Sequence, residues 1–71
     1  MNNVMEDLIL FYREWILRLQ VDCLFMTSYA SGEEDRREIK THYDKRISFL
    51  RRCIAYCRRQ ISGPAKIQTT N

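Results

Sequence analysis

Apolar residues recur along the chain at alternating intervals of four and three, the spacing of a helix that buries one stripe of its surface. The first series, here the first seam, comprises Met5, Ile9, Tyr12, Ile16, Leu19, Cys23, Met26 and Ala30. The second seam comprises Ile39, Tyr43, Ile47, Leu50, Ile54, Cys57 and Ile61. We expect the two seams to face each other, so the pattern predicts two long helices around one intramolecular core.

Helix-breaking residues lie at two places in the chain, Ser31-Gly32 and Ser62-Gly63-Pro64. They predict a hairpin over 1–62, with a helix over 3–30, a turn over 31–32 and a helix over 33–62, followed by a flexible polar tail over 63–71. A connection this short makes the helices antiparallel neighbours. The predicted fold is all-α: an antiparallel, coiled-coil-like two-helix hairpin, completed by dimerisation into a four-helix bundle.

Residues that cap helices support these boundaries. Asn2 or Asn3 is expected to cap the first helix, because its side chain can accept a hydrogen bond from a free backbone N–H. Ser31 followed by Glu34 matches a capping box for the second helix. Gly32 is expected to take the left-handed conformation that often ends a helix.

The first helix carries more apolar surface than one neighbouring helix can cover. Leu10, Leu17 and Leu24 repeat at intervals of seven, with Val21 between the last two, on a stripe more than about 90° from the first seam. Other apolar side chains flank that seam or lie on the far side of the helix: Leu8, Phe11, Trp15, Phe25 and Tyr29. Exposed together they would form a large adhesive patch. We therefore expect Leu10, Trp15, Leu17, Val21 and Leu24 to bind a second copy of the chain, a different protein, or both.

Charge is distributed unevenly. The net charge is +3, yet residues 45–71 contain seven bases and no acid, whereas residues 1–31 contain four acids and two bases. Basic and aromatic residues occur together on the second helix: Lys45, Phe49, Arg51, Arg52, Tyr56, Arg58 and Arg59. They are candidates for contact with nucleic acid, through phosphate pairing and base stacking, or with an acidic protein. A solvated face and a membrane-surface helix are the other interpretations of this stripe.

Few side chains suggest a metal site or a catalytic site. Cys53 and Cys57 resemble half of a metal site, but His42 lies too far along the helix to complete it, and Cys23 falls near His42 rather than near the pair. Core packing explains these cysteines best, with a redox role as the alternative. We predict no metal, no cofactor, no catalytic residue and no small-molecule substrate, and hence not an enzyme.

The cellular setting is predicted from the same residues. The three cysteines are an odd number and lack the spacing typical of disulfide-bonded secreted proteins, which indicates reduced thiols in the cytoplasm. The start of the chain lacks the basic region of a signal peptide. Its longest apolar run, Leu8 to Tyr12, is too short for a membrane span.

The arrangement resembles the small helical-hairpin co-chaperones of type III secretion needle subunits. The matching features are the helix from Val4 to Ala30, the turn at Ser31-Gly32 and the seam from Tyr43 to Ile61. This resemblance implies a cytoplasmic protein that shields an aggregation-prone subunit through its apolar stripe.

Together these features predict a non-enzymatic interaction module, acting as a small chaperone, adaptor or inhibitor through the excess apolar surface of the first helix. Small inhibitors of host factors from phages or mobile elements have the same general form. The alternative is a small dimeric nucleic-acid-binding regulator that uses the arginine-rich second helix.

Overall fold

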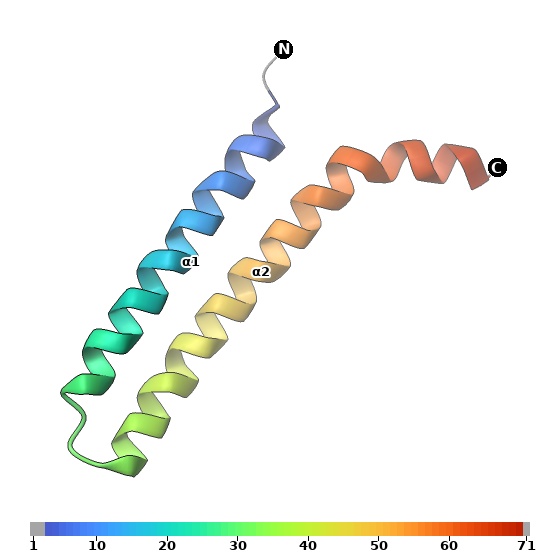
Figure 1. Cartoon of the computed structure of the whole chain (residues 1–71). Coiled ribbons are helices and arrows are strands. Elements are labelled where there is room, and N and C mark those ends of the chain that lie inside the picture. Colours follow the sequence, from blue (N-terminus) through green and yellow to red (C-terminus); the bar gives the residue numbers. More distant parts are fainter. Residues whose placement is uncertain (1–2, 71) are drawn as a thin grey trace.

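The computed structural model describes the backbone of residues 3–70 and the side chains of residues 3–62. It consists of two helices, α1 (Val4–Ser28) and α2 (Glu33–Thr70), which run antiparallel and lie side by side (Figure 1). The predicted all-α helical hairpin is confirmed. Its width and thickness are very different, because the Cα positions extend over 56 × 26 × 9 Å. The hairpin is therefore a single layer of helices with two broad faces.

The core follows the two predicted seams closely. Its buried side chains are Ile9, Ile16, Leu19, Ile47, Leu50, Ile54 and Cys57, and the partly buried Met5, Leu8, Tyr12 and Tyr43 pack against them. The seams fail only near their ends, where Met26 and Ile61 are exposed. A two-helix layer has no third element to cover the ends of its seams, so burial is confined to the middle turns.

The start of α1 is capped as predicted. The Asn3 side-chain oxygen accepts a hydrogen bond from the Met5 backbone N–H at 3.0 Å. Glu6 and Asp7 lie in the first turn, where their charge complements the positive end of the helix dipole.

The turn differs from its predicted form in two respects. The capping box is shifted by one residue: Asp35, rather than Glu34, accepts hydrogen bonds from the Ser31 backbone N–H at 3.0 Å and from its hydroxyl at 3.3 Å. The reason is that Arg36 N–H donates to the Gly32 carbonyl, which makes Gly32 the cap and Asp35 the third helical residue.

Gly32 was also expected to be left-handed, but it does not have a positive φ. Helix α1 instead ends at Ser28, with Tyr29 as its C-cap (φ −102°, ψ 5°), and short-range backbone hydrogen bonds close its last turn. These bonds join Tyr29 N–H to the Met26 carbonyl and Ala30 N–H to the Thr27 carbonyl. Such three-residue bonds satisfy terminal carbonyls without a left-handed residue.

The far end of α2 also differs from expectation. The sequence predicted an end at residue 62, yet the backbone is helical to Thr70. Figure 1 shows this last part turning away from α1. Proline lacks an N–H and its ring clashes with the preceding turn of a helix. The Gly63-Pro64 pair can therefore bend a helix instead of ending it. The sequence also predicted that residues 63–71 are flexible, and this prediction falls on residues whose side chains the structure does not describe.

Candidate functional site

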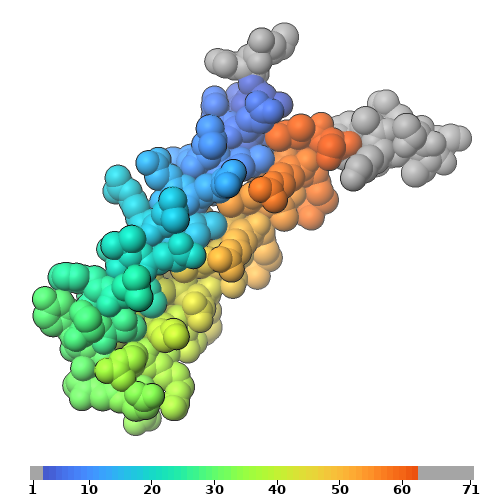
Figure 2. Space-filling view, viewed as in Figure 1, coloured from blue at the N-terminus to red at the C-terminus, as the bar shows by residue number. Residues whose placement is uncertain are grey.

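The predicted partner-binding side chains of α1 lie in the open. Leu17 is 61% exposed and Leu24 is 73% exposed, and Leu10 and Val21 are exposed to a similar degree. Figure 2 shows α1 and α2 side by side, with no further element over the broad face in view. Each helix covers one stripe of its neighbour, and the remaining apolar surface has no cover in the described chain.

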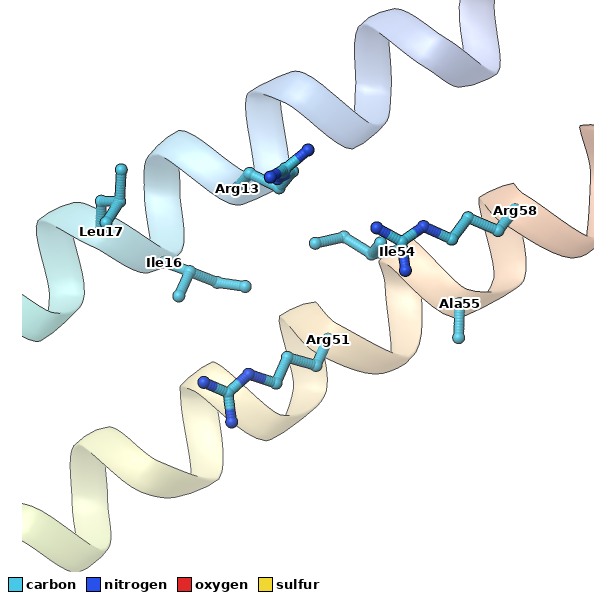
Figure 3. Close-up of a pocket in the computed structure, with 7 residues that line it drawn as sticks. All are labelled: Arg13, Ile16, Leu17, Arg51, Ile54, Ala55 and Arg58. Carbon is cyan, nitrogen blue, oxygen red and sulfur yellow. The ribbon is translucent and has the colours of Figure 1, made fainter.

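One broad face carries the leucine repeat. Leu10, Leu17 and Leu24 recur at intervals of seven on α1, and we call this side the leucine face. A groove between the helices runs along it and is lined by Arg13, Ile16, Leu17, Arg51, Ile54, Ala55 and Arg58 (Figure 3). In that view Ile16 and Ile54 point toward one another from the two helices, and the arginine side chains extend beside them.

This groove, here the arginine groove, combines an apolar floor with a positive border. Among the described side chains, the charged residues that line it are Arg13, Arg51 and Arg58, without an acid. It continues toward the turn as a second hollow, which Leu24, Ser48 and Arg51 line together with Asp44. The leucine face therefore offers exposed leucines beside a concentration of positive charge.

The opposite broad face is aromatic. Trp15 and Phe49 line one hollow there, and Phe49 and Tyr56 line the next together with Leu8. Phe11 packs edge-on against Trp15, with ring centroids 5.7 Å apart. We call this surface, formed by Leu8, Phe11, Trp15, Phe49 and Tyr56, the aromatic face.

The geometry therefore separates residues that the sequence grouped together. Trp15 was placed with Leu10, Leu17, Val21 and Leu24 as one partner-binding set, but it lies on the other broad face. The physical reason is helical phase, since Trp15 and Leu17 are two residues apart and about 200° apart around α1. Sequence reasoning also missed that Phe49 and Tyr56 of α2 join Trp15 across the helix boundary.

The basic residues of α2 are divided in the same way. Arg51 and Arg58 border the arginine groove, whereas Lys45 and Arg52 line the hollows of the aromatic face. Arg46, which was not among the predicted site residues, lines a hollow beside Lys45. Lys45 and Arg52 therefore adjoin the rings of Phe49 and Tyr56, whereas Arg51 and Arg58 form a separate basic line on the leucine face.

These bases also lack acidic partners within the hairpin. Among the side chains of residues 3–62 the structure contains one salt bridge, Arg36 to Glu33 at 2.7 Å. The five predicted contact bases, Lys45, Arg51, Arg52, Arg58 and Arg59, take no part in it. Their charge is free to meet an external anion.

Other chemistry is limited in the described part of the chain. Cys57 is buried in the core and Cys23 and Cys53 are partly buried, all three as free thiols. No group of three or more His, Cys, Asp or Glu side chains within residues 3–62 lies close enough to hold a metal ion. Over the described residues, neither helix has the length and apolar character needed to cross a membrane.

The fold and surface define an α-helical hairpin with two chemically different exposed faces. Comparison with protein-family models, with curated proteins and with solved structures finds no match.

Proposed function

We propose that the protein is a non-enzymatic interaction module that binds a protein partner through the exposed apolar side chains of α1. The observation that carries this proposal is the exposure of Leu10, Leu17 and Leu24 along one face of a single-layer hairpin. Leucines at intervals of seven match the repeat of an opposing helix. The chain would act as an adaptor, an inhibitor or a chaperone, the last being the role that the needle co-chaperone resemblance implies.

The arginine groove narrows the kind of partner. Arg13, Arg51 and Arg58 surround an apolar floor, and no acid among the described side chains lines the groove. An amphipathic helix with acidic residues beside its apolar stripe matches both properties, because its carboxylates would meet the guanidinium groups while its apolar side chains cover Leu17. In this proposal the protein works in the cytoplasm, where its three thiols stay reduced.

The test is purification of the tagged full chain from its own host, after nuclease treatment and a high-salt wash. We expect a stoichiometric protein partner to remain bound to the native chain. The double substitution Leu17→Glu and Leu24→Glu should abolish that binding, because each change buries a carboxylate against an apolar partner surface. Circular dichroism should show unchanged helicity, since both positions are exposed.

A matched control is the double substitution Thr41→Glu and Gln60→Glu, which adds the same charge at other exposed positions. This variant should retain the partner. Binding that survives in the Leu17→Glu, Leu24→Glu variant would contradict the proposal, as would the absence of any stoichiometric protein.

A second candidate function is nucleic-acid binding by α2, which the five bases without an ion pair favour. Binding of this kind weakens steeply as salt concentration rises, because phosphate contacts release counterions. Fluorescence anisotropy with labelled single-stranded and duplex oligonucleotides, measured at two salt concentrations, tests it. Salt-insensitive binding, or none at low ionic strength, would eliminate this function.

A further inference from the structure

We propose that the aromatic face binds a second copy of this chain, so that two hairpins stack face to face into a four-helix bundle. In this arrangement the leucine faces remain outside, one on each side of the dimer. The inference concerns the opposite surface from the proposed partner site, and it stands or falls independently of it.

The aromatic face has the area that a dimer interface needs. Phe11, Trp15, Phe49 and Tyr56 are each exposed by between 39% and 57%. The face also extends toward the turn, because Phe25 and Tyr29 follow Phe11 and Trp15 by two heptads and pack edge-on at 5.0 Å. At roughly 200 Å² for each aromatic side chain, six half-exposed rings leave about 600 Å² uncovered.

That area is most of what a stable interface requires, since a typical complex buries about 800 Å² on each partner. Leu8 and the aliphatic stems of Lys45, Arg46 and Arg52 line the same hollows and supply further carbon surface. Aromatic side chains of this kind are the usual anchors at the centre of an interface. A second copy of the chain would cover the aromatic face, so no additional helix and no different protein is needed to bury it.

The register of the hairpin fixes which charges would meet. Trp15 and Leu19 line one hollow of the aromatic face with Lys45, Arg46 and Phe49, and Tyr12 lines the next hollow with Phe49, Arg52 and Tyr56. Extending this register along the helices places acids of α1 within about one helical turn of the height of bases of α2. The pairs are Asp7 with Arg59, Glu14 with Arg52, and Asp22 with Lys45 and Arg46.

Within one hairpin Glu14 and Arg52 cannot meet, since each lies on the side of its helix that faces away from the core. A twofold axis parallel to the helices changes this. It lays α1 of one copy antiparallel on α2 of the second copy, with the heights of all residues preserved. The outer edges then adjoin, and the three acids of α1 face the bases of the second copy along the rim.

The leucine face is the wrong surface for the same stacking. There α1 contributes Arg13 to a groove that already contains Arg51 and Arg58. Stacking two leucine faces would bring two sets of three arginines together in a partly buried interface, which like-charge repulsion opposes. On the aromatic side α2 also contributes bases, Lys45, Arg46 and Arg52, but the α1 helix stacked on them from the second copy contributes Asp22 and its outer acids, against the single base Arg18. Charge therefore selects the aromatic face for self-association.

The test is sedimentation equilibrium of the purified full chain. We expect a species with twice the chain mass of 8.6 kDa at micromolar concentrations. The double substitution Trp15→Glu and Phe49→Glu should raise the dimer dissociation constant at least a hundredfold. The matched variant Leu17→Glu, Leu24→Glu should change it less than threefold. A monomeric native chain, or a dimer that only the leucine variant disrupts, would overturn the proposal.

A charge exchange provides a second test that does not depend on the fold of the aromatic variant. Glu14→Arg and Arg52→Glu should each raise the dissociation constant about fivefold. The two changes combined in one chain should restore it to within twofold of the native value. Additive weakening in the combined variant would overturn the α1-on-α2 arrangement, because no contact within one hairpin links these two residues.

Discussion

At the scale of single residues, burial divides otherwise similar apolar side chains into two groups. Leu50 is 3% exposed and lies in the core, whereas Leu10 is 63% exposed on the leucine face. The first stabilises the monomer by leaving water, and the second is left for an external surface. The same residue type therefore contributes to folding in one case and to binding in the other.

Substitution of these two leucines should separate the roles. Leu50→Ala is expected to lower the free energy of unfolding by about 2–5 kcal/mol, because it leaves a cavity between the helices. Leu10→Ala should change it by less than about 0.5 kcal/mol, since the side chain is already exposed. Urea denaturation followed by circular dichroism measures both, and comparable losses would contradict the observed core.

The Asn3 cap is a second feature at this scale. Asn3→Ala should destabilise α1 by about 1 kcal/mol, because the Met5 backbone N–H loses its acceptor. Asn3→Asp is the matched control and should retain the stability, since a carboxylate can accept the same bond. Thermal unfolding of the three chains provides the measurement, and an unchanged midpoint for Asn3→Ala would show that the cap is not important in solution.

At the scale of elements, the turn is set by helix capping rather than by a left-handed glycine. Asp35 reaches back to Ser31, and Gly32 provides the carbonyl that opens α2. A Cβ at Gly32 would meet no atom within 4 Å. The glycine at this turn is therefore not required by either backbone conformation or space.

Gly32→Ser should consequently stabilise the hairpin, by about 0.5 kcal/mol. Serine restricts the unfolded chain and is a better helix cap than glycine. Asp35→Ala should act in the opposite direction, because Ser31 loses its acceptor. Thermal unfolding of the two variants beside the native chain tests this, and a large loss of stability in Gly32→Ser would indicate a strained turn.

At the scale of the whole molecule, the thinness of the hairpin governs its behaviour. A layer 9 Å thick in its Cα positions cannot cover both broad faces of its own helices. Small domains of this size have a limited core and gain stability by associating. The aromatic and leucine faces are the surfaces through which this chain can do so.

Stability should therefore depend on protein concentration. If the aromatic faces associate, the midpoint of thermal unfolding should rise with concentration in the native chain, because binding stabilises only the folded form. The Trp15→Glu, Phe49→Glu variant should unfold at a midpoint independent of concentration. A native midpoint that also stays constant would show that folding and association are not coupled.

The sequence alone determined the local part of this protein. The interval pattern from Met5 to Ala30 and from Ile39 to Ile61, together with the breaker at Ser31-Gly32, predicts the hairpin, because helical periodicity and turn chemistry depend on near neighbours. The Asn3 cap and most of the core follow from the same local rules. The extent of α2 beyond residue 62 did not, since a proline is compatible with either a bend or an end.

Only the tertiary structure decided which exposed residues share a surface. It joined Trp15 of α1 to Phe49 and Tyr56 of α2, and it joined Leu17 of α1 to Arg51 and Arg58 of α2. Periodicity assigns a residue an angle around its own helix, but not the side of the neighbouring helix that lies beside it. That choice depends on how the two antiparallel helices pack, because their packing decides which side of α2 adjoins which side of α1. The result is one leucine face and one aromatic face.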